Sequence, residues 1–190
     1  MKTLGQLWIA AFLCAACGST PTSRFYVLTP VEESLGESSE SIPIRIAPIE
    51  LPKYLRGPEM ITRRERNRVE HASYDRWAEP LADGFERILG ANLARLVPSE
   101  HVVSGPWVGT VDNERVVHVF VQRFDVENQS AQLEATWSLS SSMPSTGELH
   151  RANFVSRLEG EDAAATARAM SQVLGELSLE IARAIRPAGE

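Results

Sequence analysis

Residue types that could perform catalysis occur in this 190-residue sequence, but their spacing matches no familiar catalytic or metal-binding pattern. The four histidines lie far apart, and none belongs to a His-Glu-x-x-His motif or to a Cys/His pair that would bind zinc. The chain contains no Gly-x-Ser-x-Gly elbow and no Gly-x-x-x-x-Gly-Lys-Ser/Thr loop. We therefore predict that it is not an enzyme and holds no metal and no cofactor. A hydrolase is the enzyme alternative, and it would need a serine, a histidine and a carboxylate that meet only in the folded chain.

The clearest chemical pattern lies at the N-terminus. Lys2 precedes an apolar run at residues 7–13, and small residues lead to Cys17. A positive start, a short apolar core and small residues at the cut are typical of a secretory signal, and the run is shorter than the ~20 residues that span a bilayer. The segment resembles the bacterial lipobox, with Cys14 where leucine is usual. We predict that residues 1–16 are removed and that Cys17 becomes a lipidated N-terminus; a plain cleaved signal is the alternative.

Lipidation would decide where the chain resides. Cys14 and Cys17 are the only cysteines, so the folded part has no disulfide to form even in an oxidising compartment. Several acyl chains, at ~0.8 kcal/mol per buried methylene, give a lasting anchor. Gly18 stands where an aspartate would resemble the inner-membrane retention signal. The predicted location is therefore the periplasmic face of the outer membrane, with residues 17–23 as a lipidated tether.

The charge balance limits the partners. Removal of the signal takes away Lys2 and changes the formal net charge from −6 to −7. Such an acidic chain is a poor ligand for nucleic acid, so no nucleic-acid partner is expected. The basic residues cluster in one place, at Arg63, Arg64, Arg66 and Arg68. This cluster is interpreted either as a solvated loop or as a contact with an acidic partner surface.

Hydrophobic periodicity predicts the elements. Strand patterns cover residues 24–28, 42–47, 116–124, 133–139 and 151–158, with short extended pieces at 60–63 and 69–72. The last three strands are typical of an antiparallel meander. In the 116–124 strand, alternation places Val117, Val119 and Val121 on one face and Phe120 and Phe124 on the other. Residues 32–41, 104–107 and 141–147 are expected to be loops or turns, and 51–55 a proline-aromatic turn.

Two amphipathic helices are predicted. The first runs from Glu79 or Pro80 to Val97 and ends at Pro98. The second begins near Asp162 and ends before Pro187. The predicted buried residues are Leu81, Phe85, Ile88, Leu89, Leu93 and Leu96 in the first helix, and Ala163, Ala167, Met170, Val173 or Leu174, Leu177, Ile181 and Ile185 in the second. The expected fold is a single α+β domain over residues 24–187, with both helices packed against an antiparallel sheet.

Two further segments are more specific than ordinary loop sequence. Residues 74–81 place aromatic and charged side chains at the start of the first helix, where Asp75 could cap a turn and Trp77 could pack the incoming chain onto the core. Residues 51–55 form the proline-aromatic turn. Packing and binding explain both segments about equally well.

The ordered set of segments resembles the PqiC-type (YmbA-type) auxiliary lipoproteins of ABC-type transport systems. The resemblance covers residues 23 to about 140, and Arg-Trp-Ala-Glu-Pro-Leu is its most distinctive run. The matching segments are residues 23–28, 49–55, 61–63, 75–81, 121–125 and 133–139.

This resemblance implies a non-enzymatic component of an envelope transport system. Its partner would be a periplasm-spanning MCE-domain protein that moves lipids or other hydrophobic molecules between the membranes. A ring-like homo-oligomer would suit a partner with a central channel. The expected contact residues are Tyr54, Arg63, Arg64 and Trp77. The alternative outside enzymes is a lipoprotein of another envelope assembly, such as secretion or outer-membrane biogenesis machinery.

Overall fold

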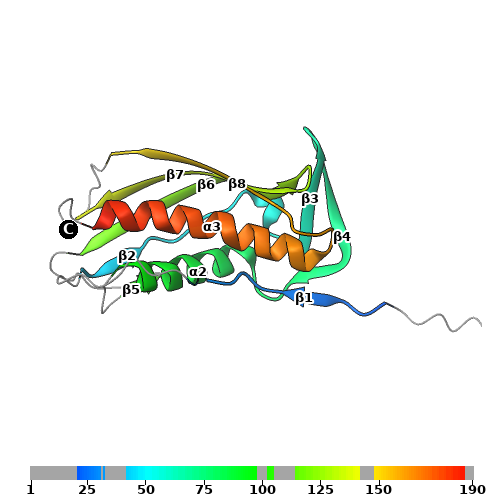
Figure 1. Cartoon of the computed structure of the whole chain (residues 1–190), viewed down its shortest axis with the longest axis horizontal. Coiled ribbons are helices and arrows are strands. Elements are labelled where there is room, and N and C mark those ends of the chain that lie inside the picture. Colours follow the sequence, from blue (N-terminus) through cyan, green and yellow to red (C-terminus); the bar gives the residue numbers. More distant parts are fainter. Residues whose placement is uncertain are drawn as a thin grey trace, which may run out of the picture.

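The computed structural model describes residues 21–30, 32, 42–97, 102–104, 114–141 and 148–186. The predicted signal, Cys17, most of the loops predicted at 32–41, 104–107 and 141–147, and the helix-ending Pro98 and Pro187 lie outside these ranges. The described residues form one α+β domain, as predicted, in which two helices cover one face of a single eight-stranded sheet (Figure 1).

The longest strands form the predicted antiparallel meander. β6 (Arg115–Glu127) pairs with β7 (Ser130–Ser140), which pairs with β8 (His150–Arg157). The β6–β7 hairpin closes through Asn128 and Gln129, whose φ angles of 50° and 58° are both positive. Two positive angles in a two-residue loop are the geometry of a type I′ turn, whose twist matches that of the strands.

The sheet as a whole is mixed. On its second edge β6 pairs in parallel with β2 (Ile44–Ile46) near its start and with β3 (Glu59–Glu65) near its end. β5 (Val102–Ser104) extends the sheet beside β2 in parallel. On the other branch β4 (Arg68–Trp77) pairs antiparallel with β3, and β1 (Arg24–Tyr26) pairs parallel with β4. The predicted antiparallel sheet is therefore extended by short parallel strands whose partners are distant in sequence.

A β-bulge in β6 corrects one prediction about the faces of that strand. The pairing with β7 shifts between Val121 and Arg123, because β6 carries an extra residue there. Beyond the bulge Phe124 pairs with Leu133 and is fully buried, on the same face as Val121. The expectation that Phe124 shares a face with Phe120 was wrong, since strict alternation does not survive an inserted residue.

Both helices match their predicted positions. α2 (Leu81–Leu96) buries all six predicted apolar residues, and Phe85 packs edge-on against Phe124 with ring centroids 5.2 Å apart. α3 (Ala163–Ile185) is capped by Asp162, whose Oδ1 accepts a 2.7 Å hydrogen bond from the Ala165 amide. Its buried stripe is wider than predicted and includes both Val173 and Leu174, while Ala163 is only half-buried. The stripe is wide because α3 contacts α2 as well as the sheet.

One polar contact fixes the two helices relative to each other. Asn92 Nδ2 donates a 3.0 Å hydrogen bond to Ser178 Oγ, and both residues are fully buried. Ser178 Oγ in turn donates to the Leu174 carbonyl at 2.7 Å. A buried amide without its partner would be costly, so this pair favours one register of α2 on α3. Over the described residues, neither helix combines the length and hydropathy required of a bilayer-spanning segment.

Candidate functional site

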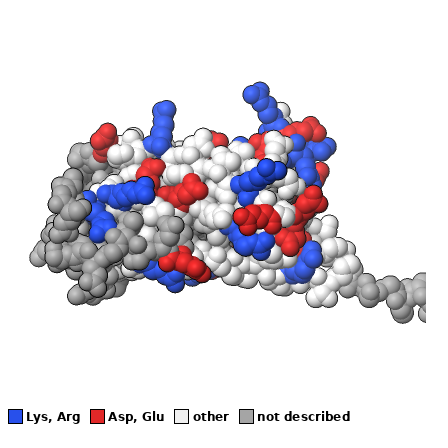
Figure 2. All heavy atoms as spheres, in the orientation of Figure 1, with Lys and Arg blue, Asp and Glu red and all other residues white. Residues whose placement is uncertain are grey.

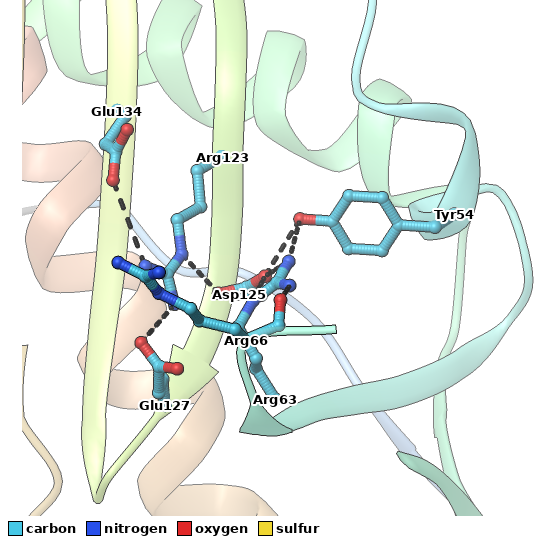
Figure 3. Close-up of polar contacts among 7 residues, drawn as sticks. All are labelled: Tyr54, Arg63, Arg66, Arg123, Asp125, Glu127 and Glu134. Atoms are coloured by element: carbon cyan, nitrogen blue, oxygen red, sulfur yellow. Dashed lines mark hydrogen bonds and ion pairs between the residues drawn. The ribbon is translucent and has the colours of Figure 1, made fainter. Parts of the chain in front are cut away.

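The most extensive polar cluster of the domain surrounds Asp125, a carboxylate with no exposed surface (Figure 3). We call this group the Asp125 cluster. Asp125 is positioned by β6 just after the bulge, which turns its side chain away from the helices. Its members come from the short helix η2 (Lys53–Leu55), from the β3–β4 hairpin, and from β6 and β7: Tyr54, Arg63, Arg66, Arg123, Asp125, Glu127 and Glu134.

Both oxygens of Asp125 are occupied. Oδ2 accepts hydrogen bonds from the Tyr54 hydroxyl at 2.8 Å and from Arg63, through Nη2 at 2.8 Å and Nε at 3.1 Å. Oδ1 accepts from Arg123 Nε at 2.7 Å. Arg123 also donates to Glu127 Oε2 at 3.0 Å. The buried negative charge is thus compensated by two guanidinium groups, which burial of an ionised carboxylate requires.

The cluster changes the acidity of its members. Burial, together with the hydrogen bond to Asp125, raises the pKa of Tyr54 to about 12. The hydrogen bond to Asp125 also raises the pKa of Arg63. For Arg123, burial opposes the charged form, but hydrogen bonds to Asp125 and Glu127 outweigh it and raise the pKa. These shifts hold the phenol neutral and both guanidiniums charged, the states the hydrogen bonds need. The arrangement is a structural clamp, in which the Tyr54 hydroxyl stays a hydrogen-bond donor at neutral pH.

The clamp stiffens the turn end of the β3–β4 hairpin. Arg63 Nη1 donates to the backbone oxygen of Arg66 at 3.2 Å, so the side chain that binds Asp125 also holds the turn. The Arg63 guanidinium lies over the Tyr54 ring, with Cζ 5.5 Å from its centroid. In Figure 1 the hairpin projects beyond the body of the sheet. The hairpin is therefore a projecting element whose turn is held in place.

The hairpin tip is basic. Residues 63–70 contain four arginines and two glutamates. Arg64 Nε pairs with Glu70 Oε2 at 2.7 Å, and Arg68 lies 3.4–3.5 Å from Glu65 and Glu70. Among the described residues no carboxylate pairs with the guanidinium of Arg66, which is exposed. Figure 2 shows charged side chains of both signs gathered at this end of the molecule. The tip thus keeps a net positive charge in an acidic protein.

The structure distributes the predicted contact residues between the interior and the surface. Tyr54 and Arg63 come together in the Asp125 cluster, and Arg64 lies on the exposed tip. Trp77 is only 6% exposed and belongs to the core, so its side chain packs and presents almost no surface. Their role in partner binding stays a prediction. Of the four side chains, only that of Arg64 is exposed enough to contact a partner directly.

Asp75 does not cap a turn. It lies within β4 and receives a two-pronged contact from Arg24, with Nε–Oδ1 at 2.7 Å and Nη2–Oδ2 at 2.9 Å. The Tyr26 hydroxyl adds a hydrogen bond of 3.2 Å to Oδ1. This pairing ties β1 to β4. The capping interpretation was wrong because the strand continues to Trp77, and α2 begins after Pro80 without any side-chain cap.

Sequence reasoning missed Asp125, Arg123 and Glu127 as members of one site. The available signal was charge at alternate positions inside a strand that is otherwise rich in valine. A charge pair that recurs every second residue on one face predicts partners across the sheet. That signal did not reveal the bulge, and without the bulge Asp125 would have been assigned to the face of the apolar residues.

The described residues include one contact between a histidine and a serine, and one open groove beside α3. His118 Nε2 lies 3.2 Å from Ser140 Oγ, yet no described carboxylate hydrogen-bonds to that histidine. No group of three or more metal-type side chains converges within the described ranges. An open groove of about 610 Å³ runs between α3 and the β7–β8 edge, where Trp137 stacks on His150 at 4.3 Å and donates to Glu180 at 2.7 Å. The groove holds aromatic surface and carboxylates but no nucleophile activated by a base.

Comparisons with known proteins agree with this geometry. One similar solved structure, of an uncharacterized protein, superimposes with a TM-score of 0.71 at 18% identity and covers 87% of this chain and 100% of its own. Another, a Xanthomonas campestris protein of the DUF330 family, gives a TM-score of 0.69 at 17% identity over 83% of this chain and 92% of its own. Both show the same fold. No curated protein matches the sequence.

A family model covers most of the domain and confirms the resemblance predicted from the sequence motifs. The family is described as the ABC-type transport auxiliary lipoprotein component, and its model matches residues 26–182. The match spans β1 to α3 and so includes the Asp125 cluster and the hairpin. This chain belongs to the family of ABC-type transport auxiliary lipoprotein components.

Proposed function

We propose that this protein is a non-enzymatic docking subunit at the outer membrane, held there by acyl chains on Cys17. In this proposal it receives a periplasm-spanning MCE-domain protein of its ABC-type system, which moves lipids or other hydrophobic molecules between the membranes. Family membership supports the transport role, and the lipobox-like segment supports the anchor.

The observation that carries the docking role is the projecting, basic β3–β4 hairpin. A docking element gains affinity when it is already ordered, because less conformational entropy is lost on binding. The Asp125 cluster orders the turn end of the hairpin through Arg63, which bonds both Asp125 and the Arg66 carbonyl. The Arg66 guanidinium, which pairs with no described carboxylate, can then meet a carboxylate of the partner, to which arginine can make two parallel hydrogen bonds.

The electrostatics fit an acidic partner surface. The negative charge on the rest of the chain exceeds the positive charge of the hairpin, since the formal net charge of the whole chain is −6. A local positive tip on a negative body orients an approaching acidic surface toward the tip and repels it elsewhere. The partner segment is therefore expected to be acidic, and the interaction to weaken as salt rises.

An affinity pull-down from crosslinked envelopes tests the proposal. The tagged wild-type chain should recover an MCE-domain protein, identified by mass spectrometry, and should fractionate with the outer membrane. The Cys17→Ala control should lose the outer-membrane fraction. Recovery of secretion or biogenesis components in place of an MCE-domain protein would contradict the transport partner.

A matched pair of charge reversals tests the surface. Arg66→Glu places a negative charge on the tip without touching the Asp125 hydrogen bonds, since only the Arg66 backbone takes part in the cluster. Arg151→Glu makes the same change at an exposed position of β8. We expect Arg66→Glu to reduce recovery of the partner severalfold and Arg151→Glu to leave it unchanged. Equal recovery with both variants would remove the hairpin from the interface.

A further inference from the structure

A second surface, separate from the hairpin tip, carries apolar side chains that the fold leaves open. Phe25 in β1 is 63% exposed, Val27 just after it is 45% exposed, and Tyr74 in β4 is 42% exposed. We call these three side chains the β1 apolar patch. Exposed aromatic and β-branched residues that occur together at one edge of a sheet call for an explanation by a partner.

Strand pairing places the patch on the outer side of the sheet. Phe25 is in register with Arg76, while Tyr26 is in register with Trp77, which is buried. Successive strand residues point to opposite faces, so Phe25 and Val27 point away from the core that Trp77 enters. Tyr74 stands two residues before Arg76 along β4. Three large apolar side chains therefore lie on a face of the sheet that α2 and α3 do not cover.

The patch lies close in sequence to the predicted lipid. Phe25 is eight residues after Cys17, so a fully extended chain places it at most about 28 Å from the anchored residue. A random-coil chain of eight residues has a typical span of only about 16 Å. The described chain also enters the fold at this edge, directly before β1 (Figure 1). The membrane surface is therefore within reach of the patch whenever the acyl chains are inserted.

From these observations we propose that the β1 apolar patch rests in the headgroup region of the anchoring bilayer and sets the orientation of the domain on the membrane. This inference depends on the proposed acylation of Cys17. Tyrosine suits an interface where one side is apolar and the other wet, and phenylalanine adds apolar surface that the headgroup/acyl boundary can bury. Because the tether makes the contact intramolecular, a patch too small to bind vesicles on its own is held at a high effective concentration.

Charge plays a minor part in this contact. The basic side chains beside the patch are already paired: Arg24 with Asp75 at 2.7 Å and Arg76 with Glu59 at 3.5 Å. The contact should therefore persist at high salt and in vesicles of zwitterionic lipid, unlike a basic patch that binds anionic lipid.

Site-specific fluorescence on the acylated protein tests the proposal. Cys14 is lost with the signal and Cys17 is blocked by lipid, so an introduced cysteine is the only free thiol. The environment-sensitive dye NBD is attached at Val27→Cys in one protein and at Val155→Cys in another. Val155 is a matched control because it is also exposed, at 57%, and lies on β8 at the opposite side of the sheet, beyond four intervening strands. Each protein is reconstituted into phosphatidylethanolamine/phosphatidylglycerol vesicles and floated on a gradient.

The proposal predicts that both proteins float, and that only the dye at position 27 shows blue-shifted emission and quenching by headgroup-proximal doxyl lipid. Adding Phe25→Ser and Tyr74→Ser to the Val27→Cys protein should return the emission to its value in water. Floating proteins with water-like emission at both positions would overturn the patch and leave the anchor intact. Equal quenching at both positions would also overturn it. Failure to float would refute the acylation of Cys17. It would also overturn the proposal, because the patch is brought to the membrane by that anchor.

Discussion

Replacing Asp125 by alanine should destabilise the domain more than the loss of any single hydrogen bond. The carboxylate has no exposed surface and receives four hydrogen bonds from Tyr54, Arg63 and Arg123. The side chains of Arg63 and Arg123 are only 19% and 17% exposed. Asp125→Ala therefore leaves two guanidiniums largely shielded from water, and Arg63 loses its only carboxylate partner among the described residues.

The size of the loss follows from the kind of interaction that is broken. Removing one member of a buried ion pair typically costs about 3–5 kcal/mol, because the remaining charge is left buried and uncompensated. Arg123 keeps Glu127 at 3.0 Å and Glu134 at 3.9 Å, which softens the penalty on its side. We therefore expect Asp125→Ala to lower the free energy of unfolding by about 3–4 kcal/mol.

Urea denaturation followed by far-ultraviolet circular dichroism measures this loss. Glu148→Ala is the control, since it removes an exposed carboxylate that takes part in no described contact, and it should change stability by less than about 0.5 kcal/mol. A loss below about 1 kcal/mol for Asp125→Ala would show that water replaces the carboxylate, and would refute the clamp. A second result is diagnostic: replacing Tyr54, Arg63, Arg123 and Asp125 together by Phe, Met, Met and Leu should recover much of the stability, because the fully buried carboxylate and both of its guanidinium partners are then removed together, and Glu127, at 21% exposure, can still reach water.

Three smaller changes test other parts of the structure. Tyr54→Phe should remove a phenol with a pKa of about 12 from an absorbance titration at 295 nm. Because that folded pKa exceeds the ordinary value of 10.0, the stability that Tyr54 contributes should be intact below pH 10 and decline toward pH 12, and the variant should lose less over that window. Asp162→Ala removes the N-cap of α3, whose carboxylate accepts a 2.7 Å hydrogen bond from the Ala165 amide. It should lower the free energy of unfolding, measured in urea, by about 1 kcal/mol. No change would mean that water caps the helix equally well. Gln129→Gly relieves a positive φ of 58° in the β6–β7 turn and should raise the free energy of unfolding by about 0.5–1 kcal/mol. The gain should appear as a higher melting temperature, and a lower melting temperature would contradict the turn assignment.

The elements that could be predicted are those specified by local periodicity. The apolar stripe of α2 and the alternation in β7 require no knowledge of distant residues, and both helices and the meander were found close to their predicted bounds. The short parallel strands were harder. β2 and β5 hold three residues each and are partners across 55 intervening residues that contain β3, β4 and α2. Nothing local in such a segment specifies its neighbour.

The site was predictable only in part, for a related reason. Tyr54 and Arg63 were singled out by residue type, and the structure does bring them together, 3.2 Å apart. Their common partner Asp125 depends on a one-residue bulge that reverses which face of β6 points outward. Trp77 was singled out as well, but a tryptophan that ends a strand shortly before a helix is equally suited to the core, and burial decides between the two roles.

Photo-crosslinking in living cells tests the docking claim most directly. The crosslinking residue p-benzoylphenylalanine replaces Arg66 at the hairpin tip, and replaces Val155 on β8 in the control. The account predicts an adduct with an MCE-domain protein from position 66 and none from position 155. An adduct from position 155 alone, or adducts from position 66 only with components of another envelope assembly, would contradict it.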